Sequence, residues 1–125
     1  MTESWPSEVR LASDRRVLSL VFDDGCRVDI PAELLRVESP SAEVQGHGPS
    51  ERKLVAGKRR VEILRVDPVG NYAVRLLFDD GHSTGIYGWP FLRDIGERQG
   101  EIVLDYEARL AQAGLGRDPK GARRT

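Results

Sequence analysis

A four-residue motif, Phe-Asp-Asp-Gly, occurs twice in this chain and constrains its fold more than any other feature. Residues 17–30 read VLSLVFDDGCRVDI and residues 73–86 read AVRLLFDDGHSTGI, at a constant offset of 56. Apolar side chains alternate before each motif, and Asp-Gly is a favoured turn between two strands. Each copy predicts a β-hairpin followed by a short helix, and two copies predict a small pseudo-symmetric domain. Because Asp-Gly turns are common, a chance likeness of two hairpins stays an alternative.

Two lengths are possible for the hairpin loop, and the apolar pattern distinguishes them. A two-residue loop at positions 24–25 pairs Phe22 with Arg27 and brings charge onto the apolar face. A three-residue loop, with Gly25 in a left-handed conformation, pairs Phe22 with Cys26 and keeps that face apolar. We therefore predict the three-residue loop in both copies. In the second copy this register gives the pairs Phe78–His82, Leu76–Thr84 and Val74–Ile86.

The remaining elements follow from local patterns. We expect strands at 8–12 and 62–66 and helices at 31–37, 89–95 and 101–112. Residues 38–60 have no periodicity and contain several prolines and glycines, so they predict a long loop. The fold class is α+β, with a small antiparallel sheet built from the two hairpin units, short helices and a C-terminal helix.

Length and charge indicate one domain followed by a tail. The chain has 125 residues, a net charge of -1 and a single cysteine, Cys26, so it has no disulfide framework. Residues 113–125 hold four basic residues and one acidic residue, and we expect a domain at 1–112 and a disordered basic tail. Without a membrane-length apolar run or a secretory signal, the expected location is the cytoplasm.

Three stretches carry the most distinctive residues of the chain. Residues 34–43 read LLRVESPSAE, residues 46–48 read GHG, and residues 69–89 include VGNYAV and FDDGHSTGIYGW. Together they resemble the gamma-butyrobetaine hydroxylase-like N-terminal domain family, over about residues 5–95. Many bacterial members of that family are small stand-alone proteins of unknown function.

The resemblance implies a fold, a metal site and two kinds of domain to which this domain is fused in other proteins. In the hydroxylases this small α+β domain precedes an iron and 2-oxoglutarate oxygenase domain and holds a structural zinc with three cysteines and one histidine. The same domain is also fused to P-loop ATPases of iron–sulfur cluster carriage. The zinc histidine corresponds to His82, and the cysteines correspond to Ser39, Ser41 and Val44. Since a structural zinc needs four nitrogen or sulfur ligands, we expect a degenerate zinc site and no cofactor.

Catalytic motifs are missing from the sequence. Neither His47 nor His82 begins the His-x-Asp/Glu motif of an iron oxygenase, and no glycine-rich loop ends in the lysine of a P-loop. The paired aspartates are typical of turns, and Cys26 fits a small core position. We expect no enzyme activity, and a labile metal site shared by His47 and His82 stays an open alternative.

The remaining candidates describe a binding surface. Basic residues gather between positions 52 and 65, where a solvated loop is one interpretation and an acidic partner or nucleic acid another. The scarcity of aromatics argues against a stacking platform for single strands, and we do not expect a nucleic acid partner. The candidate surface residues are His47, Tyr72, His82, Tyr87, Trp89, Arg59 and Arg60. We expect a non-catalytic protein-binding or adaptor module, which the family resemblance associates with iron–sulfur cluster assembly. The alternative is a metal-binding protein or a detached accessory domain of an iron/2-oxoglutarate dioxygenase.

Overall fold

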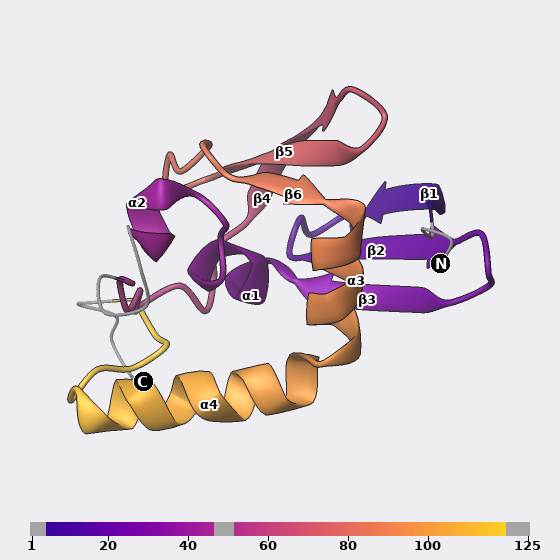
Figure 1. Cartoon of the computed structure of the whole chain (residues 1–125). Helices are drawn as coiled ribbons and strands as arrows, with labels where there is room; N and C mark the ends of the chain where they lie inside the picture. The colour runs from indigo at the N-terminus through magenta and orange to yellow at the C-terminus, as the bar shows by residue number, and fades with distance from the viewer. Residues whose placement is uncertain (1–4, 47–51, 120–125) are drawn as a thin grey trace.

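Six strands and four helices make up the part of the chain that the computed structural model describes, residues 5–46 and 52–119 (Figure 1). In chain order they are β1 (Pro6–Leu11), β2 (Val17–Phe22), β3 (Arg27–Pro31), α1 (Ala32–Val37), α2 (Ala42–Gln45), β4 (Ile63–Val69), β5 (Ala73–Phe78), β6 (Ile86–Gly88), α3 (Trp89–Glu97) and α4 (Gln99–Gln112). None of these helices has the length and apolar composition that a membrane span needs.

The strands form two antiparallel sheets of three, in the orders β1-β2-β3 and β4-β5-β6. This arrangement confirms the α+β class. Each sheet contains one copy of the repeated hairpin and is followed by a short helix, and α4 runs along the lower edge of the molecule in Figure 1. The repeat is larger than the sequence indicated, because β1 and β4 belong to it as well. Both strands carry a register shift near their start, between Pro6 and Glu8 and between Ile63 and Arg65.

The first hairpin has the predicted three-residue loop. Leu20 pairs with Val28, and the Phe22 N–H donates a hydrogen bond of 2.8 Å to the Cys26 carbonyl. Gly25 has a φ of 89°, a left-handed conformation that favours glycine. The alternation of apolar residues was therefore sufficient to predict this register.

The second hairpin has the predicted loop but a different register beyond it. The Phe78 N–H donates to the His82 carbonyl at 2.9 Å, which confirms the loop. Val74, however, pairs with Tyr87, so the predicted pairing of Val74 with Ile86 is wrong. A shift of one residue moves every following side chain to the opposite face. Tyr87 is fully buried as a result, and Ile86 is 40% exposed.

The extra residue in the second hairpin has a packing cause. Between the loop and β6 the chain leaves the strand ladder, and the Thr84 hydroxyl lies 2.6 Å from the Ser41 hydroxyl. Gly85 follows, and a Cβ atom there would lie 2.6 Å from Ser39 Oγ. Contacts with the segment after α1 therefore replace strand pairing at this point.

Apolar residues from both repeats share one core. The inward-facing side chains of the two hairpins are completely or almost completely buried, as are the leucines of the helices that follow them. The core consists mainly of Leu18, Leu20, Phe22, Ile30, Leu35, Ile63, Leu76, Phe78, Tyr87 and Leu92. Burial of this shared set is what holds the two sheets together.

Each hairpin turn is bound by an arginine from the other repeat. Arg36 Nε lies 2.7 Å from Asp80 Oδ2, and Arg93 Nη1 lies 2.9 Å from Asp24 Oδ2. Arg36 and Arg93 occupy corresponding places after their hairpins, and each aspartate also accepts the N–H of the residue two positions later. This reciprocal exchange indicates a true structural repeat rather than a chance likeness of two turns.

The predicted long loop and tail contact each other. α2 lies within the loop, and the Gly57 N–H donates to the Gly116 carbonyl at 3.0 Å. Arg117 lies in the segment predicted as a tail, and its Nη2 is 2.6 Å from the nearly buried carboxylate of Glu33. Residues 113–119 are thus joined to the body by hydrogen bonds and ion pairs, whereas 120–125 lie outside the described residues.

Candidate functional site

Two of the predicted surface residues are buried. Tyr87 is fully inaccessible, and its hydroxyl donates a hydrogen bond of 2.7 Å to the Leu35 carbonyl. Burial raises the pKa of Tyr87 far above its usual range. His82 is also buried, so neither side chain contributes to an outer surface.

Tyr72 and Trp89 are the aromatic residues that the structure places together near the surface. Tyr72 is 56% exposed, and its carbonyl accepts a 3.3 Å hydrogen bond from the Trp89 N–H. The Trp89 indole donates to the Asn71 carbonyl at 2.9 Å. Arg59 and Arg60 are both exposed elsewhere on the chain, and His47 lies outside the described residues.

Most cations of the basic cluster are already paired with carboxylates. Ion pairs join Lys58 to Asp80, Arg59 to Asp118, Arg52 to Glu38 and Arg65 to Asp67. Those of Lys58 and Arg52 are mostly buried, whereas those of Arg59 and Arg65 are more exposed. Such pairing reduces the positive potential that a nucleic acid would meet.

A partly buried polar cluster surrounds His82. Ser39 Oγ lies 2.9 Å from His82 Nε2, and Glu43 Oε1 lies 3.3 Å from His82 Nδ1. Beside them, Ser41 Oγ lies 2.6 Å from Thr84 Oγ1. Ser39 and Ser41 are both buried. Two of the positions that the family resemblance associates with zinc, Ser39 and His82, are therefore in direct contact.

Electrostatics keep this cluster in defined protonation states. Burial and the charge of Arg36 lower the pKa of His82, against the opposing effects of Glu43 and Asp80. Burial raises the pKa of Asp80, but hydrogen bonds from Lys58, from the His82 N–H and from Arg36 outweigh it and lower that pKa to about 2. At neutral pH the cluster therefore contains a neutral imidazole, and the adjacent Asp80, which accepts the His82 N–H, is ionised.

The donor atoms of this cluster do not fit a structural zinc. Hydroxyls stand at Ser39 and Ser41 instead of thiolates, and Val44 is a buried side chain without a donor atom. Both ring nitrogens of His82 already have partners. Over residues 5–46 and 52–119, no group of three or more His, Cys, Asp or Glu side chains is placed to hold a metal ion. The alternative site with His47 falls outside these ranges.

Glu43, His82 and Ser39 contact one another in the same order as the acid, the base and the nucleophile of a hydrolase triad. Ser39 is nevertheless fully buried, and Gly85 packs directly against its hydroxyl. A substrate carbonyl cannot approach a nucleophile enclosed in this way. In this structure the three residues instead link the chain after α1 to the second hairpin.

Cys26 occupies the matching place in the first hairpin. It is partly buried, and its Sγ lies 3.6 Å from Glu97 Oε2. Burial raises the pKa of Cys26, and the hydrogen bond to Glu97 acts in the same direction, against the charge of Arg93. A thiol that stays protonated is a poor nucleophile.

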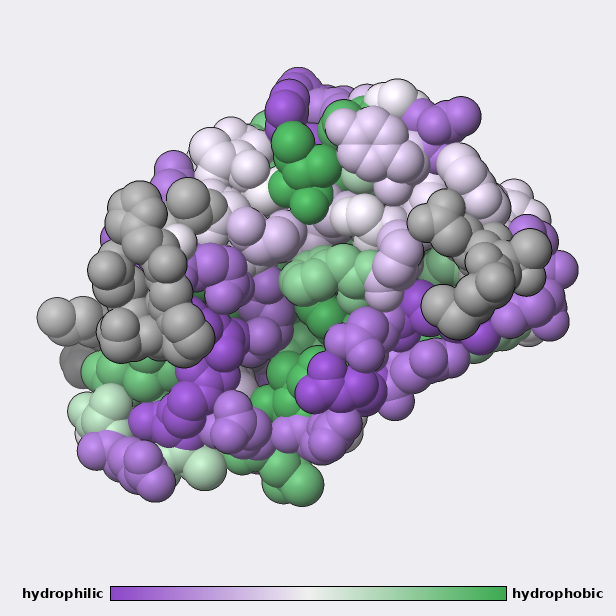
Figure 2. Space-filling model, viewed as in Figure 1, coloured by the Kyte–Doolittle hydropathy of each residue, from purple (hydrophilic) through white to green (hydrophobic). Residues whose placement is uncertain are grey.

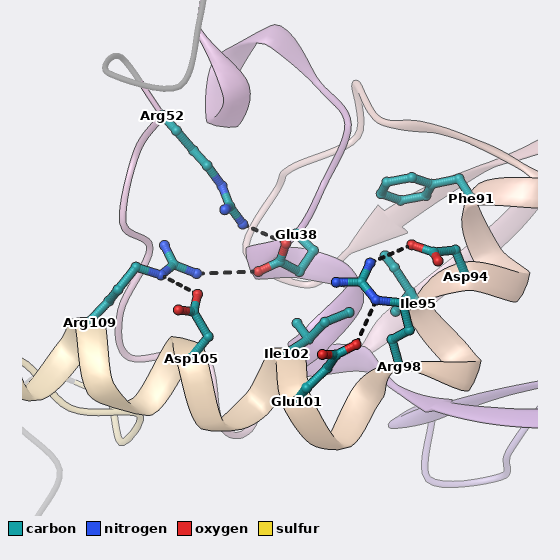
Figure 3. A pocket seen from close by; sticks show the side chains of 10 residues that line it. All are labelled: Glu38, Arg52, Phe91, Asp94, Ile95, Arg98, Glu101, Ile102, Asp105 and Arg109. Carbon is teal, nitrogen blue, oxygen red and sulfur yellow. Dashed lines mark hydrogen bonds and ion pairs between the residues drawn. The ribbon is translucent and has the colours of Figure 1, made fainter.

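An ionic cleft lies between α3, α4 and the end of α1, with a volume of about 420 Å³ (Figure 3). On the face shown in Figure 2, hydrophobic atoms lie in a hollow at the centre, and hydrophilic side chains surround them. Within the cleft, Arg52 and Arg109 reach Glu38 from two sides, and Arg98 binds both Asp94 and Glu101. These ion pairs join α3, α4 and the end of α1 across the cleft.

A second hollow is an apolar groove between the edge strands of the two sheets, with a volume of about 550 Å³. Its apolar lining comes from β1, β4, the start of β5 and the start of α3. These residues are Val9, Leu11, Leu64, Val66, Pro68, Val74 and Trp89. We call this the edge groove. Of the candidate surface residues predicted from the sequence, only Trp89 lines the edge groove, although the alternation of Val9 with Leu11 and of Leu64 with Val66 was a signal for it.

Comparison with known proteins identifies close structural relatives. A family model described as gamma-butyrobetaine hydroxylase-like, N-terminal, matches residues 9–93. Two proteins with NMR solution structures are 42% and 41% identical to this chain. The first has a TM-score of 0.81, with 99% of this chain and 98% of that chain covered. The second has a TM-score of 0.80, with 100% and 98% covered.

A third relative has a known source. It is a protein of unknown function from Acidithiobacillus ferrooxidans ATCC 23270, assigned to the DUF971 family, and its structure is a crystal structure. It is 40% identical, with 73% of this chain and 91% of that chain covered, and the TM-score is 0.61. No curated protein matches the sequence.

Proposed function

This chain belongs to the gamma-butyrobetaine hydroxylase-like N-terminal domain family, and we propose that it is a non-catalytic protein-binding module. The relative from Acidithiobacillus ferrooxidans is itself of unknown function, so family membership supplies a fold without an activity. The observation that carries the proposal is the edge groove. Its occupant is an apolar segment of a partner protein.

Exposed apolar side chains on both edge strands support this assignment. Val9 on β1 and Leu64 on β4 are exposed although they face the groove, and Leu64 is 45% accessible. Contiguous apolar surface of this kind is uncommon on a soluble monomer and is typical of binding sites. Trp89 lines the groove, and Tyr72, which accepts its N–H, is the most exposed aromatic of the described residues.

Family analogy suggests which partners to test first. The same domain is fused to ATPases of iron–sulfur cluster carriage in the proteins that this sequence resembles, so we propose an accessory role beside cluster assembly. The role is docking rather than cluster ligation, because Cys26 is the only cysteine and a cluster usually needs four thiolates.

Affinity capture from native cells, with two matched variants, tests the proposal. Leu64→Asp places a charge in the edge groove, and Leu104→Asp places the same charge on α4 at a site that is 70% exposed. Captured proteins are identified by mass spectrometry, and binding is then measured with the purified partner. We expect Leu64→Asp to abolish binding and Leu104→Asp to preserve it, with both variants folded by circular dichroism.

Two results would contradict the proposal. One is the absence of any reproducible partner for the unmodified chain. The other is equal binding by the two aspartate variants, which would place the partner outside the groove.

A further inference from the structure

The hydrogen-bond pattern of β1 shows which of its main-chain groups face outward. The Ala12 N–H donates to the Val17 carbonyl at 3.0 Å, directly after the end of β1. Along an antiparallel ladder, residue pairs that exchange main-chain hydrogen bonds alternate with pairs that do not. The Arg10–Ser19 pair, two residues before Ala12, is therefore hydrogen-bonded as well. Val9 and Leu11 therefore direct their N–H and carbonyl groups away from β2, toward the open edge. No backbone hydrogen bond within the described residues occupies these groups.

β4, the other edge strand of the groove, is blocked. The Leu64 carbonyl accepts a hydrogen bond of 2.9 Å from Arg15 Nη1. Pro68 has no N–H, and the register shift near Ile63 interrupts the start of the strand. Proline, irregularity and capped groups are the usual means by which proteins prevent pairing at an edge. β1 has a regular stretch from Glu8 to Leu11 and lacks these features there.

The same two residues of β1 have both free main-chain groups and side chains in the groove. Val9 and Leu11, which offer free main-chain groups, are also the β1 residues whose side chains line the groove. In an antiparallel addition, the residues opposite them place their own side chains on the same face. Every second side chain of an added strand would then enter the groove against Leu64 and Val66.

We propose that β1 receives an extended segment of the partner protein as a fourth, antiparallel strand of the first sheet. This inference rests on the proposed function and specifies how the edge groove is used. The recognised segment alternates apolar with polar residues, because only one of its faces meets the groove. The charged side chains of β1 and β4 form ion pairs with one another, Arg10 with Glu8 and Arg65 with Asp67, so charge sets no preference for the segment.

Backbone methylation of a model peptide tests the strand addition. The probe is a ten-residue peptide of three Val-Thr repeats, with two aspartates at each end to keep it soluble. In an antiparallel pair the valine N–H groups face β1 and the threonine N–H groups face solvent. One analogue therefore carries N-methyl groups on its valines, and the matched control carries them on its threonines. Binding is followed by NMR titration of the full-length, nitrogen-15-labelled chain.

We expect the unmethylated peptide to shift the amide signals of Val9 and Leu11. N-methylation of the valines should weaken binding by about fivefold or more, since it removes at least one main-chain hydrogen bond to β1. N-methylation of the threonines should leave the affinity unchanged. Equal affinity of all three peptides, or a loss confined to the threonine analogue, would overturn the proposal.

Failure of this inference can be separated from failure of the proposed function. If the unmethylated peptide leaves Val9 and Leu11 unperturbed while Leu64→Asp still abolishes binding of the captured partner, strand addition is wrong and the groove remains the docking site. If Leu64→Asp has no effect on that partner, the proposed function itself fails.

Discussion

Asp80 is the charged group whose replacement has the most clearly predictable effect on this fold. Its carboxylate lies 2.7 Å from Arg36 Nε and 2.6 Å from Lys58 Nζ, and it accepts the His82 N–H. Asp80→Asn preserves the shape and one hydrogen-bond acceptor but leaves two partly buried cations without their counter-charge. We therefore expect a lower free energy of unfolding.

The size of the effect follows from the pKa of Asp80. That pKa is about 2, compared with an ordinary value of 3.8, and one pKa unit corresponds to about 1.4 kcal/mol. Because the side chain is 18% exposed and solvent screens it, we discount the full conversion and expect a loss of about 1–2 kcal/mol at pH 7. Urea denaturation of the unmodified chain and the variant measures this difference.

The same argument predicts how the loss depends on pH. A carboxyl whose folded-state pKa is lowered contributes its full stabilisation above the unfolded pKa, and that contribution disappears as pH falls through the folded pKa. For Asp80 the difference between the unmodified chain and Asp80→Asn should be constant above about pH 5 and should shrink between about pH 4 and pH 2.

Asp24→Asn provides a matched control from the other repeat. Asp24 has the equivalent pairing with Arg93, but its side chain is 46% exposed, so solvent screens the interaction more strongly. We expect a smaller loss of stability than for Asp80→Asn. Equal losses in the two variants, no loss for Asp80→Asn at pH 7, or a difference that persists unchanged at pH 3 would refute the reasoning.

Three further perturbations test the packing and the polar cluster. Gly96→Ala places a Cβ atom 2.5 Å from the Val28 Cβ, so the melting temperature should fall by an amount equivalent to about 1–3 kcal/mol, and an unchanged melting temperature would contradict the close packing of α3 on β3. Ser39→Ala removes the partner of a buried His82 nitrogen and should destabilise by about 1–3 kcal/mol in urea, whereas a chelator should leave the melting temperature unchanged. Arg117→Ala removes a guanidinium that binds two carboxylates and should increase proteolysis after α4; an unchanged digestion pattern would show that these contacts do not hold the segment.

Local patterns were sufficient to predict the secondary structure around the first motif. The alternation of apolar residues and the left-handed glycine act within about ten neighbouring residues, and the register of Leu20 with Val28 follows from them. The same pattern was insufficient in the second copy. There the close contact of Gly85 with Ser39, a residue 46 positions earlier, displaces the strand by one residue and turns Tyr87 inward.

The sequence by itself determined the repeat, the two hairpin loops, the α+β class and the family of this protein, because each depends on short-range patterns or on recognisable motifs. Only the tertiary structure decided that each turn aspartate binds the arginine of the other repeat, that Ser39 and Glu43 enclose His82, and that an apolar groove stays open beside β1. These features join residues far apart in the chain, and their positions are set by how the two sheets pack over a shared core, which no local pattern encodes.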